Sequence, residues 1–111
     1  MSELGLSKNE IDTPFLWVDL DQLEANIASL AAFFRGAGMS WRPHTKGIKV
    51  PAIARKAVEA GAIGVTCAKL GEAEVMVAGG ITDILIANQV VGPLKAARLA
   101  DPAALGRALE A

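Results

Sequence analysis

The sequence contains one cysteine, Cys67, so no disulfide can form within the chain. Histidine is equally scarce, because His44 is the only one. A metal site built on it would need Asp or Glu ligands, and the neighbouring predicted strand ends supply none. Strongly apolar stretches are interrupted by Lys, Asp, Gly or Pro well before the roughly 20 residues that a membrane span needs. We therefore expect a soluble protein with no metal site of its own in this chain.

A strong excess of either charge is also missing. The 11 Lys and Arg residues nearly balance the 12 Asp and Glu residues, and the formal net charge is −1. Without a basic stripe, neither nucleic acid nor an anionic membrane is expected as a partner. Residues 1–11 are polar and mixed in charge, unlike a secretory signal, so we expect a cytoplasmic location.

Predicted strands and helices alternate along the 111 residues, of which 52% are hydrophobic. The first predicted helix has Asp21 as its N-cap, with Glu24 completing a capping box, and it ends by Gly36. Pro and Gly mark the limits of several later helices. The predicted strands are 15–18, 39–46, 62–66 and 83–87, and the predicted helices after the first are 51–60, 70–78, one from residue 93, and 102–111.

Apolar strands that alternate with amphipathic helices indicate an α/β fold with a parallel sheet and helical crossovers. About four strands are predicted, and four strands cannot close a barrel. On this evidence the chain is either a fragment of a larger barrel or a small open sheet.

The segment 40–46 carries the most informative pattern. Strand alternation places Ser40, Arg42, His44 and Lys46 on one face, and a polar face of this kind favours a cavity or a ligand. A lysine at the carboxyl end of a barrel strand lies where such folds place their chemistry, and a neutral amine there can attack an aldehyde. The alternative, equally weighted, is that the Lys46 amine extends to solvent while Arg42 and His44 pair with carboxylates elsewhere.

Further candidates follow the next two predicted strands. Thr66 and Lys69 would lie near the edge that carries Lys46, whereas Cys67 is better interpreted as a small buried apolar residue. Asn88 and Gln89 would either bind a cofactor or substrate carboxylate or cap the loop that follows. The Gly71-Glu72-Ala73-Glu74 string is interpreted as a helix start, where carboxylates suit the positive end of the helix dipole.

The string Arg42-Pro43-His44-Thr45-Lys46 is similar to the Arg-Pro-His-x-Lys segment of the D-threonine aldolase and D-serine dehydratase family. Other segments resemble the family in the same order along the chain. They are Thr13-Pro14, Val18-Asp19-Leu20-Asp21, Asn26-Ile27, Gly61-Ala62, Cys67-Ala68-Lys69, Gly71 to Glu74, and Asp83 to Asn88.

The resemblance implies the N-terminal part of an alanine-racemase-like (β/α)8 barrel, here truncated and spanning residues 1–111, in which Lys46 binds pyridoxal phosphate. With the candidates above, the predicted cofactor-binding residues are Arg42, His44, Lys46, Thr66, Asn88 and Gln89. The family's C-terminal β-domain, with its metal ligands, has no counterpart here, so a divalent metal and a homodimer are expected only of the full-length parent.

The implied activity is that of a lyase on small D-configured β-hydroxy amino acids, with cleavage of D-threonine to glycine and acetaldehyde as the first choice. D-serine dehydration comes second, and racemisation comes third because the segment resembles the aldolases more closely than the racemases. The sequence departs from the family at Gly47-Ile48-Lys49, which stands where the family commonly has Thr-His-Lys. Two hypotheses of another class stay open: a non-enzymatic protein that binds pyridoxal phosphate for cofactor homeostasis, and an inactive truncated product.

Overall fold

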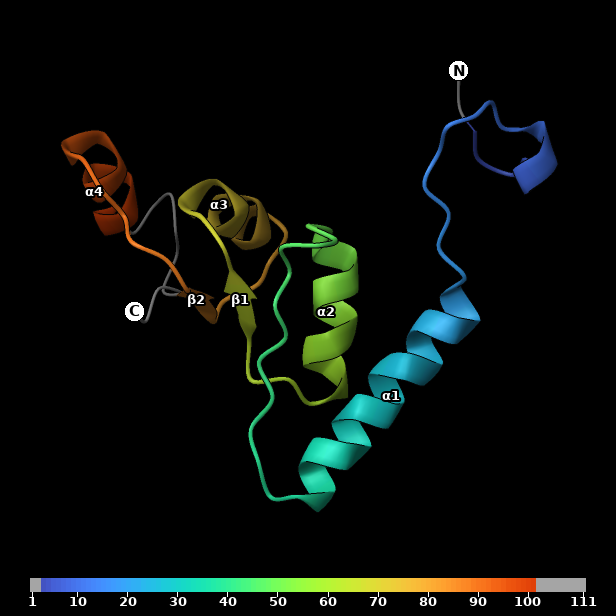
Figure 1. Cartoon of the computed structure of the whole chain (residues 1–111), viewed down its shortest axis with the longest axis horizontal. Coiled ribbons are helices and arrows are strands. Elements are labelled where there is room, and N and C mark those ends of the chain that lie inside the picture. The colour runs from blue at the N-terminus through green and yellow to red at the C-terminus, as the bar shows by residue number, and fades with distance from the viewer. Residues whose placement is uncertain (1–2, 102–111) are drawn as a thin grey trace.

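The structure is a computed structural model that describes residues 3–101. It has an α/β fold, and its regular elements follow one another as shown in Figure 1. They are η1 (Lys8–Glu10), α1 (Leu20–Gly36), α2 (Pro51–Ala60), β1 (Val65–Cys67), α3 (Leu70–Ala78), β2 (Ile84–Ile86) and α4 (Pro93–Ala100).

The two strands are parallel, as predicted, with Val65 opposite Ile84 and Cys67 opposite Ile86. Helix α3 connects them, which is the crossover that a parallel pair requires. Both strands are shorter than predicted, because residues 62–64, 83 and 87 lie in loops, and β1 extends one residue beyond the prediction, to Cys67.

The predicted strand 39–46 is reduced to a single bridge between His44 and Thr66. Its backbone nevertheless runs along the free edge of β1, where the Thr66 N–H donates to the Pro43 carbonyl at 2.8 Å and the Thr45 N–H donates to the Thr66 carbonyl at 2.8 Å. Pro43 has no N–H to add to this ladder, which explains why regular pairing is interrupted. β1 therefore lies between this segment and β2.

The predicted strand 15–18 is wrong, because the described residues offer it no neighbour. Its side chains are exposed, and that of Leu16 is fully so. Figure 1 shows this part of the chain running away from the sheet beyond the start of α1. Strand-favouring residues alone do not make a strand, since an isolated extended segment has no partner for its backbone groups.

The first helix begins earlier than predicted. Its N-cap is Asp19, whose Oδ1 accepts a hydrogen bond from the Gln22 N–H at 3.0 Å, so the predicted Asp21 cap and its box with Glu24 are wrong. Both aspartates fit the capping pattern, and Leu20 joins the helix because Asp19 reaches the first free N–H groups.

The other helix limits within the described residues agree with the Pro and Gly signals. α2 starts at Pro51 and ends before Gly61, which has a φ of 126°. α3 spans the predicted residues, and α4 starts at Pro93. The predicted helix 102–111 lies outside the described residues.

The core lies between one face of the sheet and helices α2 and α3. Val65, Cys67 and Ile84 point toward these helices and are fully buried. Thr66 and Leu85, which alternate with them, are only half-buried on the other face. Within residues 3–101, helices thus cover one side of the sheet and leave the opposite side open.

Candidate functional site

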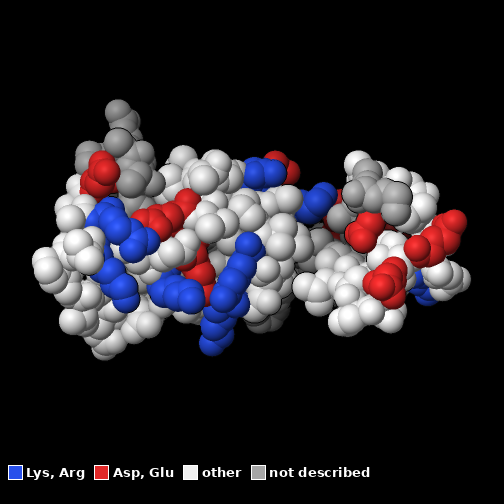
Figure 2. Space-filling model, turned by 90° about the horizontal axis from the view of Figure 1, so that it is seen from above, with Lys and Arg blue, Asp and Glu red and all other residues white. Residues whose placement is uncertain are grey.

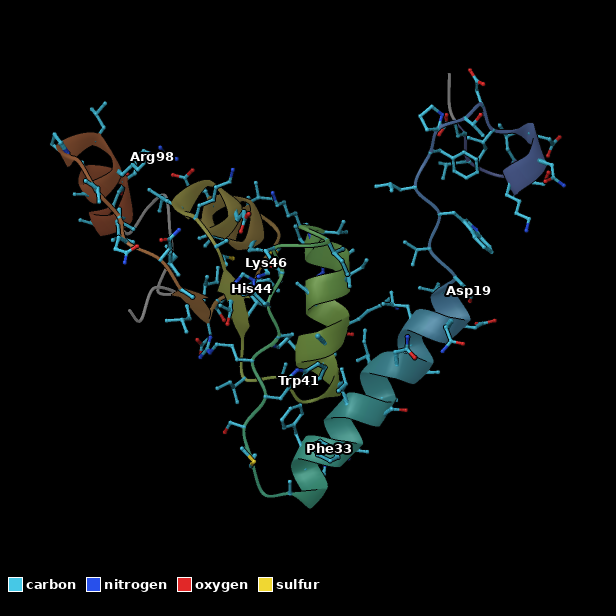
Figure 3. All side chains as sticks on the ribbon, viewed as in Figure 1. Asp19, Phe33, Trp41, His44, Lys46 and Arg98 are labelled. Carbon is cyan, nitrogen blue, oxygen red and sulfur yellow. The ribbon has the colours of Figure 1, made fainter. Side chains whose placement is uncertain are left out.

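Three chain segments meet at the carboxyl end of the sheet. Lys46 follows the segment that bridges to Thr66, and the Ala87 N–H donates to the Cys67 carbonyl at 3.0 Å. The Asn88 side chain then donates to the Ala68 carbonyl at 3.0 Å. Parallel strands bring their carboxyl ends to one edge, which in α/β folds is the edge where ligands bind. In Figure 3, Lys46 and His44 lie together beside β1, well separated from Trp41 and Phe33.

Lys46 lies on a turn that begins at Thr45. The turn is closed by hydrogen bonds from the N–H groups of Ile48 and Lys49 to the Thr45 carbonyl, at 3.2 and 2.8 Å. The Lys46 side chain is exposed, and within residues 3–101 its amine makes no hydrogen bond or ion pair. Its position therefore leaves the amine accessible to a ligand.

His44 faces the same exposed edge, and its ring is oriented by the backbone. The Nδ1 atom accepts a hydrogen bond from the Lys46 N–H at 3.1 Å. While Nδ1 accepts, the proton of the neutral ring resides on Nε2. The exposed side of His44 thus offers an N–H donor next to Lys46.

Thr45 anchors the start of the turn in the core. It is 9% exposed, and its Oγ1 donates to the Thr66 carbonyl at 3.1 Å while lying 3.5 Å from the Cys67 sulfur. Burial raises the pKa of the Cys67 thiol. The interpretation of Cys67 as a small buried residue is confirmed, and its sulfur contacts the Thr45 hydroxyl at the start of the turn.

Glu72 is a site residue that the sequence interpretation placed only at a helix start. Its side chain is 5% exposed; one carboxylate oxygen accepts from the Ala68 N–H at 2.7 Å, and the other lies 3.2 Å from the Lys49 amine. Burial opposes ionisation of Glu72 most strongly, yet the hydrogen bond from Ala68 and the charge of Lys49 together hold its pKa below the usual value. No sequence signal pairs Lys49 with Glu72, because the two lie on different elements.

Asn88 and Gln89 follow β2 at this edge. The Asn88 amide donates to the Ala68 carbonyl, and its Oδ1 accepts from the Gln89 N–H at 2.9 Å. Both ends of the Asn88 amide are therefore engaged, which favours the loop-capping alternative for this residue. Gln89 is exposed, and no hydrogen bond of its side chain is found in the described part of the chain.

Arg42 does not share this edge with Lys46. Its guanidinium lies 2.7 Å from the Asp83 carboxylate and donates to the carbonyls of Val65 and Asp83, at 3.3 and 3.4 Å. Val65 and Asp83 mark the amino ends of β1 and β2. Of the alternatives left open for Arg42, the structure shows the ion pair with a carboxylate.

Three lysines, Lys46, Lys49 and Lys69, are exposed at the carboxyl edge, where the Glu72 side chain is buried. Figure 2 looks down on this end of the molecule and shows Lys and Arg side chains over its left and central parts, with Asp and Glu side chains between them. Residues 3–101 contain no cluster of three or more His, Cys, Asp or Glu residues that would hold a metal ion. Among the same residues, no helix has both the length and the apolar character to cross a membrane.

The chain is similar to known enzymes, although no family model matches the sequence. The chain is 45% identical over 89 residues to a D-threonine aldolase from Arthrobacter sp, and the alignment covers 80% of this chain and 24% of that protein. The crystal structure of D-threonine aldolase from Filomicrobium marinum matches with a TM-score of 0.74 and 49% identity, over 76% of this chain and 23% of that one. The predicted resemblance to the D-threonine aldolase family is confirmed.

A second solved structure that matches this chain is named for a different activity. A mutant of D-threo-3-hydroxyaspartate dehydratase matches with a TM-score of 0.73 and 37% identity, over 80% of this chain and 23% of that one. The chain thus spans about a quarter of the length of the relatives it matches. It shares their α/β fold over that part.

Proposed function

We propose that this chain contributes the cofactor-binding lysine of a pyridoxal-phosphate-dependent lyase that acts on D-configured β-hydroxy amino acids. The observation that carries the proposal is the accessible, unpaired amine of Lys46 on an anchored turn at the carboxyl edge of a parallel sheet. The names of the relatives support the substrate class, because D-threonine and D-threo-3-hydroxyaspartate both have a β-hydroxyl group.

The same proposal includes the fold of the whole protein. We infer that residues 1–111 form the N-terminal part of a (β/α)8 barrel whose C-terminal β-domain lies elsewhere in the parent. In the described residues, helices cover only the face that carries Val65 and Cys67, and neither β2 nor the segment 41–45 has a further strand beside it. In a closed barrel, additional strands would satisfy both edges and enclose the face that carries Thr66.

The side chains at this edge suit the chemistry of pyridoxal phosphate. The Lys46 amine is free to bind an aldehyde, and the Nε2–H of His44 is available beside it. Lys69 and Gln89, both exposed at the same end, add a positive charge and an amide. When bound, the cofactor supplies an electron sink for negative charge that develops at the substrate α-carbon.

The residues of this chain would hold and orient the reacting groups. Thr45 holds the turn against β1 through its hydrogen bond to the Thr66 carbonyl, which restricts the positions that the Lys46 backbone can adopt. His44 donates from Nε2 because its Nδ1 is already engaged by the Lys46 backbone. Asn88 holds the loop after β2 against Ala68 and thereby keeps Gln89 at the same edge.

Cleavage of D-threonine is our first choice of reaction. The Cα–Cβ bond breaks, the β-hydroxyl proton passes to a base as acetaldehyde leaves, and Cα takes up a proton to give glycine. Dehydration of a β-hydroxy D-amino acid is the second choice, favoured by the likeness to a dehydratase. Both relatives are named as enzymes, which supports a lyase over a non-enzymatic cofactor-binding protein.

The proposal is tested by adding pyridoxal phosphate to the purified 111-residue chain and recording its absorbance before and after borohydride reduction. Peptide mapping of the reduced protein locates the modified lysine. We expect labelling at Lys46, with Lys46→Arg abolishing it and Lys69→Arg leaving it in place. Equal labelling of Lys46, Lys49, Lys56 and Lys69 would contradict the assignment.

The reaction is tested separately in the full-length parent protein. Product analysis with D-threonine, D-serine and the corresponding L-amino acids distinguishes aldol cleavage, which yields glycine, from dehydration, which yields a keto acid. We expect activity on D-isomers. Turnover restricted to L-isomers would contradict the substrate class even if Lys46 binds the cofactor.

A further inference from the structure

We propose that Glu72 is a positioning residue for Lys46, because its carboxylate ties the far end of the turn that carries Lys46 to the end of β1. This inference rests on the proposed role of Lys46 as the cofactor-binding lysine. Glu72 does not touch the Lys46 side chain; it acts through Lys49 on the turn and through the Ala68 backbone.

The geometry of Glu72 joins two neighbouring segments of the sheet edge. Ala68 directly follows β1, and its N–H donates to one carboxylate oxygen at 2.7 Å. The other oxygen lies 3.2 Å from the Lys49 amine. Because Glu72 is held in the first turn of α3, the carboxylate is fixed by a packed helix and not by a mobile loop.

The side chains at the far end of the turn are exposed. Thr45 is buried at the start of the turn, whereas Gly47, Ile48 and Lys49 are all exposed. Lys49 has a φ of 58°, in the left-handed region that non-glycine residues seldom adopt. A residue held there requires contacts that stabilise the conformation. Within residues 3–101, Lys49 has the backbone hydrogen bond to the Thr45 carbonyl and the side-chain ion pair with Glu72.

Lys46 lies between the two anchors. Thr45 fixes the turn to the Thr66 carbonyl on one side, and Glu72 fixes it through Lys49 on the other. With both in place, the Lys46 backbone has one orientation relative to the edge that carries Asn88. Loss of the Glu72 contact would leave the fold intact, since the buried core of α3 rests on Ala73 and Met76, and would release only the turn.

The test uses the 111-residue chain with three variants. Glu72→Gln keeps the size of the side chain but removes its charge, and Lys49→Met removes the partner without touching the core. Glu74→Gln is the matched control, because Glu74 lies on the same helix but pairs with Arg98 of α4. Amide hydrogen exchange at Ile48, Lys49 and Ala68 is measured by NMR, together with the apparent dissociation constant for pyridoxal phosphate at Lys46 and the global unfolding transition.

We expect Glu72→Gln and Lys49→Met each to speed exchange at Ile48 and Lys49 by roughly tenfold, the size expected for a lost hydrogen bond to a charged group. Both variants should weaken pyridoxal phosphate binding at Lys46 by a similar factor and spread the borohydride label to other lysines. Lys49→Arg keeps the positive charge and should behave like the wild type. Glu74→Gln should change neither the exchange at Ile48 and Lys49 nor the binding of pyridoxal phosphate.

Unchanged exchange at Ile48 and Lys49 in both Glu72→Gln and Lys49→Met would overturn the inference, as would an increase in exchange there that is matched at core amides such as that of Met76. Failure of the wild-type chain to bind pyridoxal phosphate at Lys46 would count against the proposed function instead. In that case the exchange data still decide whether Glu72 holds the turn.

Discussion

The Arg42 guanidinium and the Asp83 carboxylate lie 2.7 Å apart, at the amino end of the sheet. Arg42 also donates to the Val65 carbonyl, so one side chain joins the segment before Lys46 to β1 and to the residue that precedes β2. Lys46, a short distance further along the chain, lies at the opposite end. Arg42 therefore has a structural role at the amino end of the sheet, whereas the Lys46 amine is accessible to a ligand at the carboxyl end.

Replacement of Arg42 should weaken folding more than replacement of Lys46. Arg42→Met removes a half-buried ion pair and two backbone hydrogen bonds, and we expect the free energy of unfolding to fall by about 1–3 kcal/mol. Lys46→Met, at an exposed position, should change it by less than about 0.5 kcal/mol. Urea denaturation followed by circular dichroism measures both, and equal effects would contradict the separation of roles.

The two aspartates at the start of α1 should differ in their contributions. Asp19 accepts the Gln22 N–H, so Asp19→Ala should destabilise the helix by roughly 1 kcal/mol. Asp21 lies within the first turn, where its charge interacts favourably with the helix dipole. Asp21→Ala should therefore lower the free energy of unfolding by only about 0.3 kcal/mol. Helix content and thermal unfolding are the measurements. A larger effect at Asp21 would restore the cap that the sequence predicted.

Gly79 allows α3 to end against the start of α2. A Cβ atom at Gly79 would overlap the ring of Pro51, so Gly79→Ala should destabilise the chain by about 1–3 kcal/mol. Gly71→Ala is the matched change on the same helix, where a Cβ would meet nothing within 4 Å. It should leave stability unchanged or raise it by up to about 1 kcal/mol. Chemical denaturation of the two variants decides between packing and helix propensity as the cause.

The Cys67 thiol should react slowly with thiol reagents in the folded chain. Its side chain is fully buried, and burial raises its pKa, so the reactive thiolate is both scarce and inaccessible. We expect modification by a disulfide reagent at pH 8 to be roughly a hundredfold slower than in urea, where no opening step is required. Comparable rates in the two states would mean that the sheet edge opens readily.

Glu72 should make folding stability depend on pH in the acid range. Its pKa in the folded chain lies below the usual value of 4.5, so the unfolded chain binds the proton more tightly. The stabilisation is therefore present above about pH 4.5 and is lost as the pH falls through the lowered pKa. The difference in unfolding free energy between the wild type and Glu72→Gln should be clear at pH 7 and disappear near pH 2. A difference that persists at the lower pH would assign the effect to packing.

Much of the fold follows from local signals. Pro51 and Pro93 begin helices, and Gly61 and Gly79 follow the last residues of two others, because these residues restrict or free the backbone where they stand. The parallel pairing also agrees with the prediction, since both strands are apolar and a helix connects them. The ambiguity between Asp19 and Asp21 shows the limit, because two adjacent capping patterns differ by little free energy.

The candidate site was predictable where a residue's place follows from its position at a strand end. His44 and Lys46 came from the strand pattern and from the family resemblance, and they do lie together at one edge. Asn88 was placed at the same edge because it follows the next predicted strand. Glu72 was missed because its role depends on a contact with Lys49, and nothing in the helix-start pattern of Glu72 indicates that partner.

By itself the sequence determined the order of helices α1 to α4 with the two strands between them, the family resemblance, and the choice of Lys46 as the candidate lysine. All three depend on residue types and their spacing. The tertiary structure alone decided that residues 15–18 pair with no strand in the described part of the chain, that Arg42 binds Asp83, and that Glu72 contacts Lys49 on the turn of Lys46. These outcomes depend on which segments meet in space. A backbone group or a charge is satisfied by whichever partner the packed chain brings within reach, whatever its distance along the sequence.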